Sequence, residues 1–470
     1  MNLPLKQIVV ALALIAGANT SAAASKEIDQ HFKVDAGQKI VIEGFSGSRI
    51  RFSSWNKPEV YVHLTVSISA SDEKYEQQFI DAVKIEERRS ADAVVIRFDD
   101  AGNTIKQTRS LWEGVKSLFG MRSVSREVHG EIFVPVGNDL TANIPYANVS
   151  LENMNGNIRI TGSSNELTLR NCTSLEMIAN DYGKTLIQNS GGNLTLTGQS
   201  GTISVENFDG AISCNAPYGK LRFSHIRKPL KVRSQSGEIT IDDVQGNLNV
   251  ASDYSPISIM NVAGFAEVQS QSGTITIRQV DGASVKSDYS KIELANVTGK
   301  ANREIVIGNQ SGSIAVADVV GNLRIDGAYS RITMNDVKGN VRVTSQSGSV
   351  AGENIDGDWD SETQYSSVRV SRLNAKQVRA SNSSDPVKFD LTSVPNSISI
   401  RNQYADVAIN MPRGFSGEVN LDVEYGTIAS NLPINVKNKS NSAYAVGKVG
   451  SGSGLISIET TSGKISLMEK

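Results

Sequence analysis

The chain has 470 residues, a formal net charge of −2, 40 glycines, 11 prolines and two cysteines. This near-neutral charge argues against a nucleic-acid partner, which would need a basic patch, so we expect no nucleic-acid binding. A chain of this length could form several domains, but a short internal repeat through most of it favours one elongated β architecture.

The first 24 residues have the features of a secretory signal peptide. Lys6 supplies a positive charge, residues 8–18 are apolar, and Ala22 to Ala24 form a small-residue cleavage site. The apolar core is too short to span a bilayer as a helix, and no cysteine for lipid attachment lies near the cleavage site. We therefore expect an exported protein, either periplasmic or at the cell surface or extracellular.

Residues 25–137 are predicted to form a β-rich N-terminal cap that leads in to the repeat and covers its first coil. Alternating apolar and polar residues indicate the strands, and one polar stretch indicates a short helix. The strands are expected at Phe32–Val34, Lys39–Glu43, Arg49–Phe52, Val60–Val66 and Ala93–Phe98, and the helix at Asp72–Ala82.

A second helix is predicted inside this cap, over Thr104–Met121. Its apolar residues, among them Trp112 and Phe119, fall on one side, and basic residues lie among the rest. Such a helix could cover the open end or the flank of the repeat, where an exposed edge needs protection. Trp112 and Phe119 could instead contact a membrane or a partner. Both interpretations stay open, with coverage of the edge favoured.

Residues 138–410 carry a repeat of about 18 residues. Each unit has two apolar doublets that alternate with polar residues, such as Ile239/Ile241 and Leu248/Val250, which is the period of strands with one buried face. Two short strands with tight corners require each coil to stack in parallel on the next. We predict an all-β fold, a single-stranded parallel β-helix with strands about 4.8 Å apart along its axis, and the general crossover preference favours the right-handed form.

Two columns of the repeat mark one of its corners. Asn and Asp tolerate a left-handed backbone conformation, so a polar column at this corner has a local cause. The residue after each member should point inward, and a glycine two residues further on should adopt positive φ. The polar column comprises Asn153, Asn171, Asn189, Asn207, His225, Asp243, Asn261, Gln279, Asn296, Asp318, Asp336 and Asn354.

A further column alternates between tyrosine and serine on successive coils, because Ser-Asp-Tyr-Ser and Ser-Gln-Ser-Gly align. One interpretation is packing, in which a large ring lies over a small residue of the neighbouring coil. The other is a ladder of aromatic platforms roughly 9.6 Å apart, suited to stacking on a repetitive glycan. The small residues between the rings favour packing. The candidate binding residues are Tyr218, Tyr254, Tyr289, Tyr329 and Tyr365.

The repeat loosens after Asp358, and residues 411–470 are predicted to form a C-terminal β cap. Strands are expected at Gly417–Glu424 and Leu455–Ser466, separated by a polar loop around Lys437–Ala443. Terminal units of a solenoid differ from the rest because they must hide the last sheet edge.

The sequence offers no catalytic or metal-binding pattern. Corner acids interchange with asparagine, which fits a turn role, and no two carboxylates have the spacing for glycoside hydrolysis. The four histidines lack metal-ligand spacing. Cys172 and Cys214 fall in different columns and coils, so we expect two buried thiols and no disulfide. We expect no enzymatic activity, no cofactor and no metal; the alternative is a polysaccharide lyase or hydrolase, by analogy with other β-helices.

Several motifs resemble the bacterial putative-adhesin family, a domain of unknown function. They are Trp55-Asn-Lys-Pro-Glu-Val-Tyr-Val, Gly130-Glu-Ile-Phe-Val-Pro-Val and the repeated S-G-x-I-x-I and N-V-x-G units. The ending, Gly454-Leu-Ile-Ser-Ile-Glu-Thr-Thr-Ser-Gly-Lys-Ile-Ser-Leu, is similar to the closing hairpin-like turn of that family. The resemblance covers most of the mature chain. It implies a β-helix with an envelope or cell-surface role, such as adhesion, and it transfers no catalytic residue.

The sequence thus predicts an exported, non-catalytic β-helix that presents a repetitive surface. Its expected partners are surface glycans or envelope proteins, bound by many weak contacts that add through effective concentration. Membrane docking through the helix at 104–121 is the alternative to this mode of binding.

Overall fold

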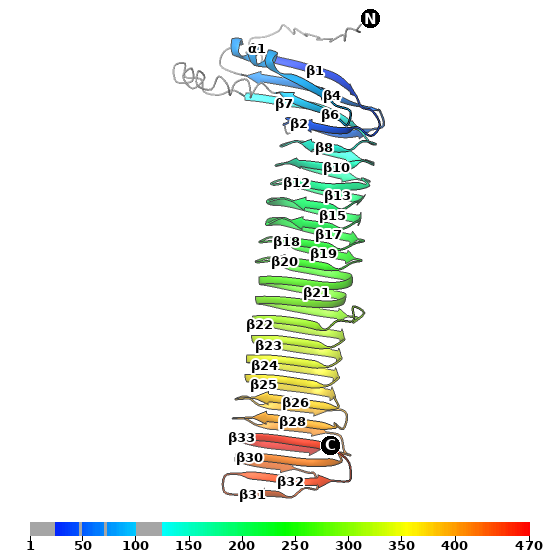
Figure 1. Ribbon diagram of the computed structural model, residues 1–470. Coiled ribbons are helices and arrows are strands. Elements are labelled where there is room, and N and C mark those ends of the chain that lie inside the picture. The colour runs from blue at the N-terminus through cyan, green and yellow to red at the C-terminus, as the bar shows by residue number, and fades with distance from the viewer. Residues whose placement is uncertain (1–23, 47–48, 70–72, 100–124) are drawn as a thin grey trace, which may run out of the picture. The chain divides into compact units, whose positions relative to one another are not determined.

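The computed structural model (Figure 1) describes residues 24–46, 49–69, 73–99 and 125–470. They fall into two compact units, the N-terminal unit up to Arg227 and the C-terminal unit from Lys228, and each is described by itself. Almost all of the described chain is β-strand, and parallel coils of about 18 residues stack on one another within each unit. The predicted parallel β-helix is confirmed, and its right-handed sense stays a prediction.

Two of the predicted segments fall largely outside the described residues. The predicted signal over residues 1–24 is described only at Ala24. The predicted helix over Thr104–Met121, with Trp112 and Phe119, lies entirely outside the description. In the part of the chain that is described, no helix has the length and the hydropathy that crossing a membrane requires.

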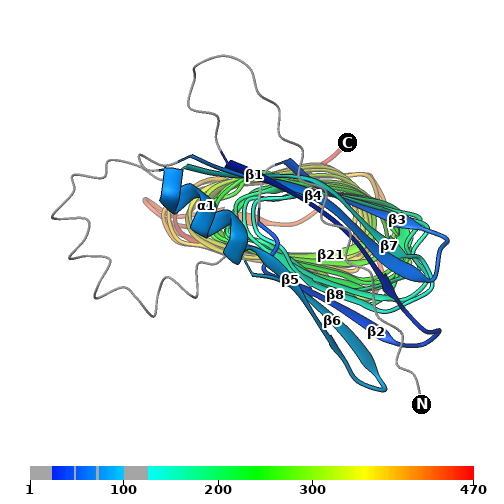
Figure 2. The ribbon, with the colours of Figure 1, turned by 90° about the horizontal axis from the view of Figure 1, so that it is seen from above.

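The described residues of the N-terminal unit form 17 strands and helix α1 (Glu73–Ala82), which was predicted over Asp72–Ala82. The helix packs on the first and fourth strands, as Figure 2 shows, and the Lys26 ammonium donates to the carbonyl of Val83 just beyond the helix end at 2.7 Å. The strands are β1 (Ala24–Lys33), β2 (Lys39–Glu43), β3 (Arg49–Trp55), β4 (Glu59–Ser69), β5 (Lys84–Arg89), β6 (Ala93–Asp99), β7 (Ser125–Pro135), β8 (Leu140–Asn143), β9 (Asn148–Glu152), β10 (Asn157–Gly162), β11 (Glu166–Arg170), β12 (Ser174–Asn180), β13 (Lys184–Gly191), β14 (Leu194–Thr197), β15 (Ser200–Asp209), β16 (Ile212–Asn215) and β17 (Tyr218–Ile226).

Two parallel stacks build the coils of this unit. Strands β8, β10, β12, β14 and β16 form one stack. Strands β9, β11, β13, β15 and β17 form the other. Consecutive strands of the chain alternate between the stacks, so each pair of strands makes one coil, as the 18-residue period requires.

The C-terminal unit contains the remaining 16 strands, and the longer ones, such as β22 to β25, run through a corner of the coil (Figure 1). They are β18 (Leu230–Ser234), β19 (Ile239–Val244), β20 (Leu248–Ser252), β21 (Ile257–Val297), β22 (Ile305–Val320), β23 (Leu323–Lys338), β24 (Val341–Asp356), β25 (Trp359–Asn374), β26 (Gln377–Asn382), β27 (Val387–Leu391), β28 (Ser397–Asn402), β29 (Val407–Met411), β30 (Gly417–Ser430), β31 (Val436–Asn438), β32 (Ala443–Val449) and β33 (Gly454–Glu469).

The core is a set of aliphatic columns inside the coils. Ile314, Ile332, Val350 and Val368 lie opposite one another on successive coils, and none is more than 1% exposed. Burying one such side chain contributes about 1.5–3 kcal/mol. The alternation of buried and outward residues along each strand therefore fixes which side chains reach the surface.

The predicted corner is confirmed at every one of its twelve coils. All twelve members of the polar column have positive φ, between 50° and 59°. The inward residue after each is buried, with at most 6% of its surface exposed, as at Ser190. Their amides also link coils, as where Asn207 donates to the Asn189 side chain at 2.8 Å.

The role predicted for the corner glycines is only half right. Gly192, for example, has a φ of +126°. Gly210 does not have positive φ, but a Cβ there would collide with the carbonyl oxygen of Gly192 in the neighbouring coil. At such positions glycine is required by the close approach of two backbones and not by a left-handed conformation. Gly156, Gly246, Gly264 and Gly282 likewise lack positive φ.

One coil of the N-terminal unit, formed by β2 and β3, is out of chain order. Strand β2 pairs in parallel with β6 and β8, and β3 pairs in parallel with β7 and β9. The coil of β2 and β3 therefore lies between two coils that follow each other later in the chain. Beyond it, β4 and β1 add to β7 and β5 adds to β6, all antiparallel. The predicted cap thus contains a parallel coil and does more than cover the repeat.

The C-terminal unit closes by the same device. Strand β33 pairs in parallel with β28 and β29 on one side and with β30 on the other (Figure 1). Strands β32 and β31 then add antiparallel to β30 and β32. The expected strands at 417–424 and 455–466 are present, but the expected hairpin-like ending is wrong, because β33 is a parallel coil between two others.

Candidate binding surface: the tyrosine column

Six exposed tyrosines follow one edge of the C-terminal unit. Ser311 lies opposite Tyr329 and Ser347 opposite Tyr365, so tyrosine and serine alternate at this position from coil to coil. Each of the six tyrosines keeps between 55% and 64% of its surface exposed. We call these six tyrosines, together with the serines that alternate with them, the tyrosine column. In spatial order it comprises Tyr254, Ser272, Tyr289, Ser311, Tyr329, Ser347, Tyr365, Ser384, Tyr404, Ser462 and Tyr425.

The alternation continues through the coil that is out of chain order. Ser462 lies opposite Tyr425, and its backbone N–H donates to the carbonyl of Gln403, next to Tyr404, at 2.7 Å. Ser462 therefore lies between the two tyrosines in space, although it follows both in the sequence. The pattern belongs to the stacking of the coils and not to their order along the chain.

Buried polar side chains hold the backbone on which these rings stand. Ser255, directly after Tyr254, is fully buried, and its hydroxyl accepts a hydrogen bond from the Ser252 hydroxyl at 2.6 Å. The buried Asn309 amide donates to the carbonyls of Ser290 at 2.9 Å and Ser311 at 3.0 Å. Hydrogen-bonded groups under the corner limit its motion, and a preorganised surface loses less entropy when it binds.

A second line of side chains, most of them polar, runs beside the tyrosine column. It consists of the residue that precedes each column member, and we call it the flanking column. Its members include Asp253, Gln271, Asp288, Gln310, Ala328, Gln346, Gln364, Ser383 and Gln403. Two of them, Ala328 and Ser383, are small, and a hollow opens at that level.

This first hollow has a volume of about 560 Å³, and its lining includes Ala328 and Gln364, which directly precede Tyr329 and Tyr365 in the chain. Thr344 donates from its hydroxyl to Asp326 at 2.6 Å. Its lining comprises Asp326, Ala328, Thr344, Ser345, Gln346, Glu362, Thr363, Gln364, Ser381 and Ser383.

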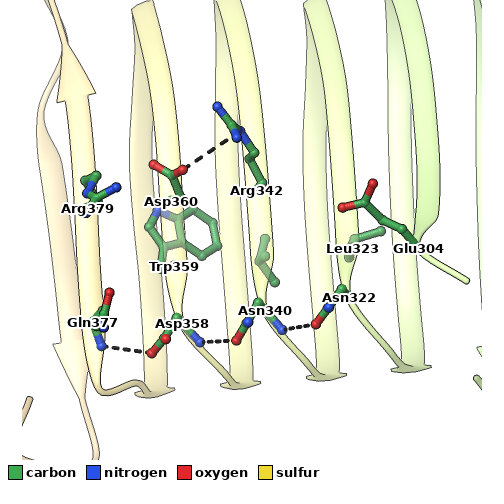
Figure 3. Close-up of a pocket in the computed structure, with 11 residues that line it drawn as sticks. Glu304, Asn322, Leu323, Asn340, Arg342, Asp358, Trp359, Asp360, Gln377 and Arg379 are labelled. Carbon is green, nitrogen blue, oxygen red and sulfur yellow. Dashed lines mark hydrogen bonds and ion pairs between the residues drawn. The ribbon is translucent and has the colours of Figure 1, made fainter. Parts of the chain in front are cut away.

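A second hollow, of about 320 Å³, lies at the start of the same strands (Figure 3). Its floor carries a row of side chains that accept from the next coil: the N–H of Asn340 donates to Asn322 at 3.1 Å, and that of Asp358 to Asn340 at 2.9 Å. The row is therefore committed to holding the coils together. Figure 3 shows Arg342 pointing to Asp360, 3.8 Å away, above the buried Trp359.

The arginines near the first hollow are already paired. Arg324 lies 3.1 Å from Asp326, and Arg342 lies 3.6 Å from Glu362. Exposed pairs such as these contribute at most about 1 kcal/mol each to stability. They do neutralise the cations that would otherwise attract an anionic ligand.

The structure places four of the five predicted binding residues in the tyrosine column of the C-terminal unit and the fifth, Tyr218, in the N-terminal unit. There Tyr218 lies opposite Ser200, and Tyr182 and Tyr146 are also more than half exposed. Tyr146 was missed, although a step of two coils back from Tyr182 reaches it. Tyr425 was missed because its coil is displaced in the chain. Trp112 and Phe119, the other candidates, lie outside the described residues.

The two cysteines are buried free thiols, as predicted. Burial raises the pKa of Cys172 to about 11 and that of Cys214 to about 12, so neither is a thiolate at neutral pH. Among the described residues no cluster of three or more His, Cys, Asp or Glu side chains could hold a metal ion.

Residues 267–468 match the model of the Toastrack DUF4097 family. This part of the chain is similar to Toastrack domains. The resemblance to an adhesin-like β-helical domain of unknown function is thereby confirmed. The matched residues include the lining of both hollows and the tyrosine column from Ser272 onward.

Among solved structures, the crystal structure of a putative cell adhesion protein from Clostridium sporogenes is similar to this chain at 10% sequence identity, with a TM-score of 0.14. The similarity covers 95% of this chain and 100% of that one. No curated protein matches the chain.

Proposed function

We propose that the protein is exported and binds an extended glycan of a cell envelope or cell surface along the tyrosine column, in adhesion or in envelope organisation. The observation that carries the proposal is the alternation of exposed tyrosine with serine through the out-of-order coil. A pattern left over from duplication of a coil pair would end where chain order breaks. Here a remote segment supplies Ser462 at the position where the pattern needs a small residue.

Space filling accounts for this pattern less well than binding does. A ring that served only to fill space would be largely covered, whereas each tyrosine of the column keeps more than half of its surface exposed. Exposed aromatic residues in a row are an unusual use of surface in a monomeric protein. Rings at roughly 9.6 Å intervals present a regular set of flat apolar faces.

The proposed mechanism is multivalent stacking on the faces of successive sugars. Each aromatic contact is worth about 0.5–1.5 kcal/mol, so one ring alone binds weakly. Several rings on one polymer add through effective concentration, which makes affinity depend on the length of the glycan. The protein contributes no bond-breaking step in this mechanism.

Export is part of the proposal and is supported by the first 24 residues, with their positive charge, apolar core and small-residue cleavage site. A non-catalytic role is supported by the raised pKa values of the two thiols and by corner acids that interchange with asparagine.

The test is binding of the full chain to a glycan array, followed by calorimetry with the best ligand. The variant Tyr289→Ala/Tyr329→Ala/Tyr365→Ala should lose about tenfold or more in affinity, because three stacking contacts are removed. The control Val320→Ala/Val446→Ala/Leu455→Ala changes three exposed apolar residues away from the column and should bind as the wild type does. Unchanged binding by the tyrosine variant, with both variants folded by circular dichroism, would refute the proposal.

A further inference from the structure

We infer that the first hollow, beside Tyr329 and Tyr365, is a specificity subsite that selects an uncharged, polyhydroxylated sugar unit of the glycan. The inference rests on the proposed binding along the tyrosine column and deepens it. It concerns residues that no stacking argument requires: Gln346, Gln364 and the carboxylates of the hollow.

The hollow has a local cause in the flanking column. Where other coils carry a long exposed Asp or Gln, Ala328 and Ser383 leave room. Between these two small residues stand Gln346 and Gln364 on adjacent coils, and the register from Ser345 to Tyr365 places them side by side. The sequence thus opens the surface at one level and keeps two amides at its centre.

These amides are available to a ligand. Within the described residues neither Gln346 nor Gln364 makes a side-chain hydrogen bond, whereas Gln199 in the N-terminal unit accepts from the hydroxyl of Tyr182 at 2.9 Å. Each amide offers donors and an acceptor in one plane. Sugar hydroxyls, which both donate and accept, complement such groups.

The charges of the hollow disfavour an acidic sugar. No lysine or arginine lines it, while Asp326 and Glu362 do. The guanidinium groups of Arg324 and Arg342 are engaged with those same carboxylates. A carboxylated or sulfated sugar would meet like charge and no free cation, whereas a neutral hydroxyl can donate to either carboxylate.

The spacing of the rings suits an extended polymer over this hollow. Tyr329 and Tyr365 stand two coils apart, roughly 9.6 Å, and the small Ser347 between them leaves space above the surface. A β-linked chain that presents the same face at every second sugar could stack on both rings. Its intervening hydroxyls would then reach Gln346 and Gln364.

The test uses calorimetry of the full chain with three probes: cellohexaose and N-acetylchitohexaose, which are neutral, and hexagalacturonate, which is acidic. We expect a neutral probe to bind at least about tenfold more tightly than the acidic one. Gln346→Ala/Gln364→Ala should lower neutral binding by about tenfold, the loss of hydrogen bonds worth about 1.4 kcal/mol. The matched control Gln271→Ala/Gln310→Ala, in the same column but outside the hollow, should change it by no more than about twofold.

A second variant tests the charge argument. Asp326→Asn/Glu362→Gln removes the two carboxylates and frees Arg324, while Arg342 keeps Asp360 as a partner, so binding of hexagalacturonate should rise severalfold. The inference is overturned if the acidic probe binds the wild type as well as the neutral probes do, if no neutral probe binds, or if the two glutamine pairs behave alike. If the tyrosine variant loses binding but Gln346→Ala/Gln364→Ala does not, the inference fails and the proposed function stands. If the tyrosine variant still binds a neutral probe, the inference and the proposed function are both refuted.

Discussion

The regular coils from β22 to β25 and the closing coil at β33 share one side-chain pattern but differ in chain order. In the regular coils, neighbours are 18 residues apart, as in the hydrogen bond from Asn340 to Asn322. In the closing coil the N–H of Lys464 donates to Asp406, 58 residues away. Both nevertheless place aliphatic residues inward and a tyrosine or serine at the same corner. The columns are therefore selected by position in the stack.

Removing the closing coil should have the largest effect on this comparison. Deletion of residues 454–470 takes away four fully buried aliphatic residues, leaves β30 without a parallel neighbour and uncovers one edge of β29. At about 1.5–3 kcal/mol for each buried side chain, we expect a loss of roughly 6–12 kcal/mol. Urea denaturation followed by circular dichroism measures it. Deletion of Lys470 alone is the control, and equal stability of both truncations would show that the closing coil is dispensable.

Core substitutions test whether chain order matters for packing. Ile332 in a regular coil and Ile456 in the closing coil are both fully buried. Changing either to Ala should lower the free energy of unfolding by about 2–5 kcal/mol, since a cavity opens in each case. A much smaller loss for Ile456→Ala would mean that the closing coil is loosely packed, and hydrogen exchange in β33 would then be fast.

A pair of glycines compares a position that requires glycine with one that does not. Gly348 has a φ of +142°, and a Cβ there would collide with the carbonyl of Ser330, whereas Gly308 has ordinary φ and open space. Gly348→Ala should destabilise by more than about 1 kcal/mol, while Gly308→Ala should be neutral or stabilise by up to about 1 kcal/mol. Chemical denaturation of the two variants provides the measurement, and the reverse order would contradict the geometry.

The polar corner should give the smallest effect. Asn261 holds a φ of 57°, which costs a side chain other than Gly or Asn about 1–2 kcal/mol. Asn261→Ala should therefore lose about 1 kcal/mol, and Asn261→Gly should lose less, because glycine adopts this φ without strain. Equal losses in thermal unfolding would show that the amide hydrogen bond to Asp242, at 2.8 Å, matters more than the backbone conformation.

Local chemistry made much of the fold predictable from the sequence. A strict period places like residues above one another, and Asn or Asp at a corner indicates a left-handed backbone conformation. The polar column, the inward residues that follow its members and strand β2 (Lys39–Glu43) were therefore predicted correctly. The order of coils in space was not predictable, because β33 has the same residue pattern wherever it inserts. For the same reason Tyr425 was missed.

The candidate site was predictable only in part. The sequence placed tyrosine and serine in one column but could not tell a covered ring from an exposed one. The first hollow depends on the substitution of Ala328 and Ser383 for longer residues at a position that showed no strong pattern. The sequence also gave no sign that Arg324 and Arg342 would be paired, because those contacts run within and between coils.

The inserted coil at β33 changes how the C-terminal unit can come apart. In a simple stack the last strand in the sequence is also the outermost layer. A pulling force or an exopeptidase can then remove that layer by breaking a single interface. Here strand β33 lies between two layers, so withdrawing this strand breaks two interfaces at once. An adhesive protein that bears load along its stack would gain resistance to unravelling from that arrangement.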